Sequence, residues 1–238
     1  MLIVDAGPLG SVGSAERMAT RNRASTVATM ADPPIEPPST ELTGWAAELL
    51  HRICDPEVSA HCERSFQFAA LIACAEGLVV DMEVVYIGTL LHDVGLADSL
   101  AGPDRFEARG ANAARSLLLE AGMHPARVAN VWDVIALHAI STLAAHKSPE
   151  TSLANRGISI DVRGVGFDKL PAADVRAVLD TWPRRTFAAA FERILADEVR
   201  SNPGTARFSW LESVGVAHIE GYVAGDFLAG LRASQSFV

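Results

Sequence analysis

Apolar residues recur at helical spacing along most of the chain from Ser39 onward. The segment STELTGWAAELLHRI begins with Ser39 or Thr40 in the place of an N-cap and continues with apolar residues at helical intervals. A second helix is expected over Glu57–Glu76. Asp81 is expected to cap a third, which runs to about residue 94 and closes on Gly95 as its C-terminal glycine.

The same pattern continues to the end of the chain. ARGANAARSLLLEAG predicts a helix of small residues that ends at Gly122, and Pro125 begins a helix that contains His138. Ser148 and Pro149 stand where an N-cap and a first helical residue are expected. Further helices are expected after Pro171, near Arg184–Arg200 and after Ser209. The predicted fold class is therefore all-α, a helical bundle.

Residues 1–38 follow a different pattern. MLIVDAGPLGSV is typical of a strand that runs into a turn, and ADPPIEPPSTE is rich in proline, as extended linkers are. The sequence therefore predicts a short irregular N-terminal arm over residues 1–38 and a helical domain over residues 39–238.

Composition narrows the function classes. The net charge is −9, the two lysines are Lys147 and Lys169, and the arginines are scattered, so no basic nucleic-acid-binding face is expected. No apolar run approaches the roughly 18 residues of a membrane span, and the first residues lack the pattern of a signal peptide. The three cysteines, Cys54, Cys62 and Cys74, show no CxxC spacing, which favours a reducing cytoplasmic environment.

The stretch TLLHDVGLAD places His92 and Asp93 side by side at the end of an apolar helix. Buried charges are costly unless they are paired or bound to a metal. An imidazole nitrogen with a carboxylate oxygen suits Zn²⁺, Fe²⁺ or Mn²⁺. Because two protein ligands are too few for a tight site, further ligands are expected from other helices, and His61 and Asp161 are the candidates.

The order of His61, then His92–Asp93, then Asp161, each on a different helix, resembles the HD-domain superfamily of metal-dependent phosphohydrolases and related enzymes. HCERSFQFA, LLHDVGL, RFEARGANAARSLLLEAG, VWDVIALHA and HKSPETSLANRGISIDVRG are similar, in order, to blocks of its cyanamide hydratase-like branch over residues 45–220. The resemblance implies a helical domain with one divalent transition metal, zinc first and Fe²⁺ or Mn²⁺ as alternatives. It implies His61, His92, Asp93 and Asp161 as the ligands.

The resemblance also implies a reaction, in which water adds to a small nitrile such as cyanamide. Glu107 and His138 match positions around the pocket. Leu96 stands where many single-metal HD nucleotidases carry a glutamate, which argues against their mechanism. The stretch between Asp98 and Phe106 lacks the Thr/Ser cluster associated with cyanamide hydratases, so the substrate stays open.

Three side chains are expected to take part in proton transfer. Asp98 or Glu107 could take a proton from attacking water or return it to a leaving nitrogen. His138 lies on the apolar face of its helix, where it is either a core histidine or a catalytic group. The apolar wall of the pocket is expected from Phe66, Phe68 and Phe106.

Two other functions stay open. An HD-type phosphohydrolase would need positive side chains for the phosphate, and Arg64 is the arginine that the sequence places near the metal. A non-catalytic helical regulatory or binding module is the second alternative. The expected partner is a small-molecule substrate, with no nucleic acid and no membrane, and the sequence leaves a homo-oligomer open.

Overall fold

Side chains at the helix starts satisfy backbone N–H groups that have no partner within the helix. In the computed structural model, which describes residues 35–234, Thr40, Asp81 and Ser148 each accept a hydrogen bond from the backbone N–H three residues later. Pro125 and Pro149 occupy first helical positions, where no backbone N–H is needed. The helix starts predicted at these residues are therefore confirmed.

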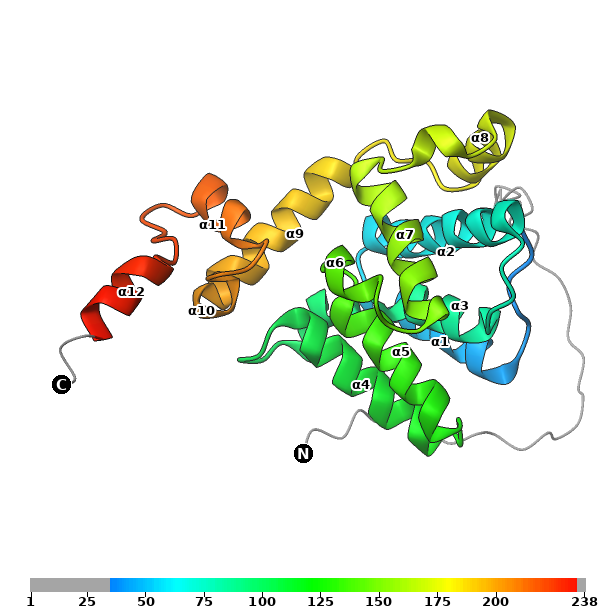
Figure 1. Cartoon of the computed structure of the whole chain (residues 1–238), viewed down its shortest axis with the longest axis horizontal. Helices are drawn as coiled ribbons and strands as arrows, with labels where there is room; N and C mark the ends of the chain where they lie inside the picture. Colours follow the sequence, from blue (N-terminus) through cyan, green and yellow to red (C-terminus); the bar gives the residue numbers. More distant parts are fainter. Residues whose placement is uncertain (1–34, 235–238) are drawn as a thin grey trace, which may run out of the picture. The chain divides into compact units, whose positions relative to one another are not determined.

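Within the described residues the chain is all-α, as predicted, with twelve α-helices, three short 3₁₀ segments and no β-strand (Figure 1). The elements are α1 (Glu41–Ile53), α2 (Pro56–Glu76), α3 (Met82–Leu91), η1 (Val94–Leu96), η2 (Asp98–Leu100), α4 (Phe106–Glu120), α5 (Pro125–Leu137), α6 (Ser141–Ala144), α7 (Pro149–Arg163), η3 (Phe167–Lys169), α8 (Ala172–Thr181), α9 (Phe187–Ser201), α10 (Pro203–Ala206), α11 (Glu212–His218) and α12 (Phe227–Ala233). The strand expected near residues 1–12 and most of the expected arm lie outside the described residues.

The third helix ends earlier than predicted. α3 stops at Leu91, and Asp93 has left the helical conformation, with φ −106° and ψ 6°. Gly95 is not a left-handed C-cap, because it lies in η1 without a positive φ. A Cβ on Gly95 would lie 1.9 Å from the backbone oxygen of Phe106. The prediction of a helix that runs to about residue 94 is wrong, because a close contact with α4 and not a helix end requires this glycine.

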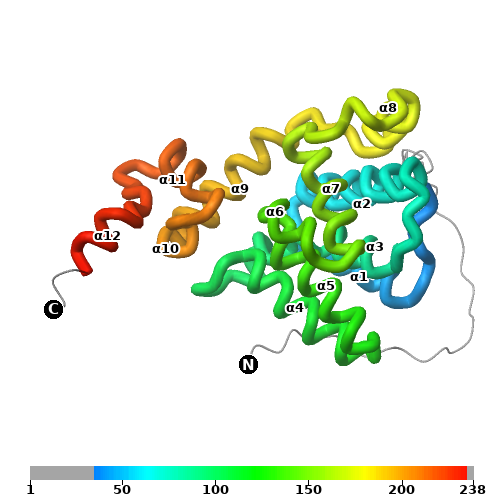
Figure 2. The backbone as a smooth tube through the Cα atoms, viewed as in Figure 1, coloured from blue at the N-terminus to red at the C-terminus, as the bar shows by residue number. Residues whose placement is uncertain are grey.

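α2 lies at the centre of the main core. α7 crosses it with the most extensive packing of any helix pair, and α3 and α9 also pack against it (Figure 1). α3 packs against α1 and α5, and α5 against α4, a course that the backbone trace also follows (Figure 2). Residues in the first half of α2, at the end of α3, at the end of α5 and in α7 are thereby brought to one region of the core.

A smaller apolar cluster lies over the start of α4. Its buried residues come from α4, α9, α10 and the segment before α11, and they are Phe106, Leu195, Val199, Ala206 and Leu211. This cluster packs the segment between α10 and α11 against Phe106 at the start of α4. α12, by contrast, has no buried residue.

The described end of the arm is tied to the helical domain. The backbone N–H of Ile35 donates to Gln67 Oε1 at 3.0 Å, and Gln67 Nε2 donates to the Ile35 carbonyl at 2.9 Å. With Ile35 in place, Gln67 is 1% exposed, so both of these hydrogen bonds are shielded from water. The sequence predicts that residues 1–38 form an arm separate from the helical domain. In the structure, however, Ile35 packs against the main core.

A chain that begins at Ser39 is expected to be less stable than one that begins at residue 34. The truncation removes two shielded hydrogen bonds between Ile35 and Gln67, each worth about 0.5–1.5 kcal/mol net. Urea unfolding of the two chains measures the difference. Equal urea midpoints would contradict a structural role for Ile35.

Candidate metal centre

His61 lies near the start of the second turn of α2 and is completely buried. Its Nδ1 faces Asp161 Oδ2 at 2.6 Å. A carboxylate can only accept a hydrogen bond, so Nδ1 carries the hydrogen and Nε2 keeps its lone pair when the ring is neutral. The unprotonated Nε2 points to the neighbouring histidine, His92, at 3.0 Å.

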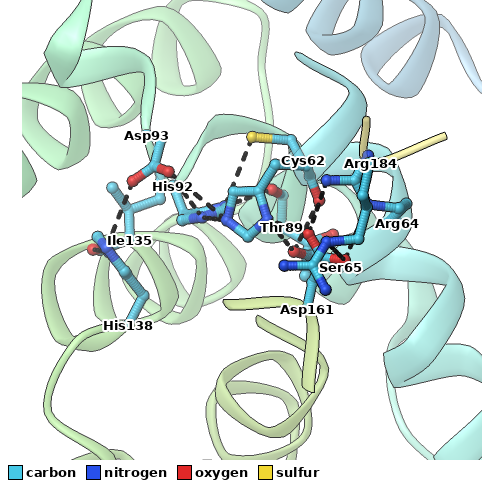
Figure 3. Close-up of polar contacts among 11 residues, drawn as sticks. Cys62, Arg64, Ser65, Thr89, His92, Asp93, Ile135, His138, Asp161 and Arg184 are labelled. Atoms are coloured by element: carbon cyan, nitrogen blue, oxygen red, sulfur yellow. Dashed lines mark hydrogen bonds and ion pairs between the residues drawn. The ribbon is translucent and has the colours of Figure 1, made fainter. Parts of the chain in front are cut away.

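His92 and Asp93 converge because α3 ends between Leu91 and Asp93. His92 is the C-cap residue, and its Nδ1 faces the Thr89 carbonyl oxygen at 2.7 Å. A carbonyl oxygen is an acceptor, so this nitrogen also carries the hydrogen, and Nε2 is unprotonated when the ring is neutral. Asp93 Oδ2 lies 3.2 Å from His92 Nε2 and 3.7 Å from His61 Nε2. Figure 3 shows Asp93 beside the His92 ring.

His61, His92 and Asp93, called the ligand group below, form a cluster that could hold a metal ion. Both carboxylate oxygens of Asp93 are buried, and neither has a hydrogen-bond partner within residues 35–234. With neutral rings, two nitrogen lone pairs and a carboxylate face one another with no hydrogen between them, an arrangement that repels unless a cation lies among them. Two nitrogens bound tetrahedrally to one zinc at about 2.0–2.1 Å lie roughly 3.3–3.4 Å apart. The 3.0 Å between the two Nε2 atoms is slightly shorter than that separation.

The pKa directions of Asp93 and His61 agree with this arrangement, whereas that of His92 favours its protonated form when no metal is bound. Burial by itself raises the pKa of Asp93, but His92, followed by His138 and His61, lowers it well below its usual range. Burial lowers the pKa of His61 and outweighs the opposite effect of Asp161. For His92, burial also acts to lower the pKa, but the adjacent Asp93 raises it overall. The carboxylate is therefore ionised at neutral pH.

His138 borders the ligand group from the end of α5. Its Nδ1 faces the Ile135 carbonyl oxygen at 2.7 Å, and its Nε2 lies 3.4 Å from Asp93 Oδ1. Burial, followed by the charge of His92, lowers the pKa of His138. The ring is therefore neutral near pH 7, with an unprotonated Nε2 turned to Asp93 (Figure 3). The structure thus places His138 beside the ligand group, and its role, as a core histidine or a catalytic group, stays a prediction.

The structure places Asp161 on the Nδ1 side of His61 and not among the ligand group. Arg64 donates from Nε to Asp161 Oδ1 at 2.8 Å and from Nη2 to Oδ2 at 2.9 Å (Figure 3). Burial raises the pKa of Asp161, but the hydrogen bonds and charges of His61 and Arg64 outweigh it and hold the pKa at about 2. Its role as a direct ligand, which the resemblance implies, stays a prediction.

The two carboxylates expected in proton transfer are not brought into the ligand group. Glu107 is buried and accepts hydrogen bonds from Arg105 Nη2 at 2.5 Å and from Trp210 Nε1 at 3.1 Å. Burial raises the pKa of Glu107, but Arg105 lowers it overall, so the carboxylate stays ionised. Asp98 begins η2, is exposed, and lines a separate cavity of about 310 Å³ that also borders Asp93.

A pocket of about 140 Å³ opens on the ligand group. Besides His61, His92, Asp93 and His138, it is lined by Ala139, Ile158, Ser159, Val162, Arg163, Phe191 and Trp210. The apolar wall therefore comes from α7, α9 and the segment before α11. The sequence analysis missed these residues, because no local pattern indicates which distant helix covers a site.

The phenylalanines expected in that wall lie elsewhere. Phe66 packs edge-on against Tyr86, and Phe68 packs near Phe167, with ring centroids 4.6 and 6.3 Å apart. Phe106 is fully buried and packs against the rings of Trp210 and His138, with centroid distances of 6.2 and 5.8 Å. The expectation is therefore wrong for the pocket surface, because all three rings are used in the core.

Arg163 is the cationic side chain among the residues that line this pocket. Its Nη2 donates to Ser141 Oγ at 3.0 Å and to Ser159 Oγ at 2.9 Å. In the part of the chain that the structure describes, its hydrogen-bond partners are thus hydroxyl groups and not carboxylates. The charge of Arg163 is not neutralised by these contacts.

No family model matches the chain, and no curated protein sequence matches it. None of the helices in residues 35–234 has the length and apolar character that a membrane crossing requires.

Proposed function

We propose that the chain is a metal-dependent HD-domain enzyme that activates water to hydrate or hydrolyse a small nitrogen-containing substrate, as cyanamide hydratases do. The observation that carries the proposal is the ligand group, in which two imidazole Nε2 atoms meet an ionised carboxylate that has no hydrogen-bond partner among the described residues. The order of these residues in the sequence supports the HD superfamily. Imidazole with carboxylate favours zinc, or else Fe²⁺ or Mn²⁺.

His61 Nε2, His92 Nε2 and Asp93 would hold the metal. A bound divalent transition metal supplies Lewis acidity, which makes water a nucleophile near neutral pH. His138 Nε2 is positioned to accept the proton that water loses, because its Nδ1–H is committed to the Ile135 carbonyl. In this role His138 takes the place expected of Asp98 or Glu107.

Glu107 acts through Trp210. The indole N–H donates to the Glu107 carboxylate, which fixes the ring as part of the pocket wall. Together with Phe191, Trp210 supplies apolar surface that limits the access of water to the reacting atoms. The pocket, at about 140 Å³, is smaller than the roughly 300–1,000 Å³ typical of drug-sized ligands. This size supports a substrate of few non-hydrogen atoms.

A phosphohydrolase is the second candidate, and Arg163 is the observation that favours it. An arginine binds phosphate through paired N–H donors, and the guanidinium of Arg163 borders the pocket with no carboxylate partner among the described residues. Arg64, the arginine that the sequence suggested for this role, is committed to Asp161. A single arginine provides little positive charge for binding a phosphate. Hydration or hydrolysis of a nitrogen compound therefore remains the first proposal.

The zinc-loaded protein is expected to convert cyanamide, a simple nitrile or a small amide, and to leave nucleoside monophosphates intact. Product formation is measured for both panels, with Asp93→Ala as the metal-free blank. Metal-dependent phosphate release without turnover of any nitrogen compound would overturn the first proposal. In that case Arg163→Ala should raise the KM for the phosphate ester at least tenfold. A protein that binds metal and turns over neither panel would favour the non-catalytic module.

A further inference from the structure

Both carboxylate oxygens of Asp161 are occupied. Oδ2 accepts from His61 Nδ1–H at 2.6 Å and from Arg64 Nη2 at 2.9 Å, and Oδ1 accepts from Arg64 Nε at 2.8 Å. All three side chains are 0% exposed. Both oxygens of Asp161 therefore have hydrogen-bond partners, whereas neither oxygen of Asp93 has one in the part of the chain that the structure describes.

The two nitrogens of His61 lie on different edges of its ring, and they have different partners. Nδ1 faces Asp161, and Nε2 faces the ligand group. Metal-binding histidines characteristically donate their other N–H to a carboxylate, which fixes the tautomer and the ring orientation. The contact between His61 and Asp161 has this form.

We propose that Asp161 is not a metal ligand but a positioning residue, which, held by Arg64, keeps His61 in its Nδ1–H form with Nε2 directed at the metal. This inference rests on the metal centre proposed above. It departs from the ligand role that the resemblance to HD proteins implies for Asp161.

Residues at the end of α8 and at the start of α9 also contact His61 and Arg64. The Phe187 ring stacks on His61, with centroids 5.0 Å apart and planes 29° apart, and the guanidinium of Arg64 lies 5.1 Å from the Phe187 centroid. Arg64 Nη1 also donates to the Trp182 carbonyl at 3.3 Å. The orientation of His61 is therefore set by contacts from α2, α7 and the start of α9.

The wild-type protein provides the first test, which needs no metal. Long-range ¹H–¹⁵N NMR of the metal-free protein at pH 8 should report His61 with Nδ1 protonated and Nε2 unprotonated. In Asp161→Asn the tautomers should become mixed, because an amide no longer selects one of them. A wild-type His61 protonated at Nε2 would overturn the inference, whatever the protein binds.

Cobalt titration provides the second test. Asp161→Asn should bind Co²⁺ about 10–100-fold more weakly than the wild type while keeping its visible absorption bands, because the ligands are the same. Changed bands would mean that the coordination shell has lost a ligand, and the positioning role would be wrong. If Asp161→Asn does not fold, Arg64→Lys, which weakens the hold on Asp161, should give the same result of weaker binding with unchanged bands.

Arg184→Gln is the matched control. Arg184 Nε lies 3.6 Å from Asp161 Oδ1, and its side chain is 36% exposed, so its loss should change Co²⁺ affinity less than threefold. An effect as large as that of Asp161→Asn would contradict the specific role of Arg64. A wild type that binds no Co²⁺ at all would instead defeat the proposed function, and the NMR result would still decide the state of His61.

Discussion

Asp93→Ala is expected to abolish the increase in melting temperature that zinc produces in the wild-type protein. Binding to the folded state alone stabilises by about 2.7 kcal/mol at a free metal concentration 100 times Kd. For a domain of this size, that corresponds to a rise of roughly 5–11 °C. The substitution removes the one carboxylate of the ligand group, so two imidazoles remain. The melting temperatures of both proteins are measured in the presence of zinc and in the presence of a chelator.

Asp98→Ala is the control for Asp93→Ala. It removes the same charge five positions along the chain, but Asp98 is exposed and lies outside the ligand group. Its melting temperature should rise with zinc as in the wild type. If zinc stabilises Asp93→Ala as much as it stabilises the wild type, the metal is bound elsewhere and the proposed centre is wrong.

Gly157→Ala is expected to destabilise the protein strongly, because α2 and α7 pack in direct backbone contact at this glycine. An added Cβ would lie 2.3 Å from the Ser65 carbonyl oxygen and 2.7 Å from the Ala69 nitrogen. These are backbone atoms, so relief of the clash requires a shift of one helix. Overpacking of this kind costs about 1–3 kcal/mol or more. Urea unfolding measures the loss.

The shift should also affect the site, since α2 carries His61 and α7 carries Asp161. Gly157→Ala is therefore expected to weaken metal binding as well as stability. Gly44→Ala in α1 is the matched control: no atom lies within 4 Å of the position of its Cβ, and alanine in an exposed helix stabilises by up to about 1 kcal/mol. Equal stability of Gly157→Ala and the wild type would contradict the close helix crossing.

The residues that bind the metal in this proposal differ in how far the sequence predicts them. His92 and Asp93 are adjacent in an apolar setting, and His61 precedes them on another helix, so residue types and order predict these three together. The structure brings them into one cluster. Asp161 follows from the same resemblance, yet the side of the His61 ring on which it lies depends on how α7 crosses α2 and on Arg64. Nothing in the local sequence contains that information.

The sequence by itself determined the fold class and the helix starts. Thr40, Asp81 and Ser148 cap helices through hydrogen bonds that reach three residues along the chain, and such short-range interactions are readable from the residues alone. Only the tertiary structure decided the early end of α3, the pocket wall with Trp210, and the neutral His138 beside Asp93. Each of these depends on burial and on contacts between segments far apart in the chain, which the packing of the helices creates.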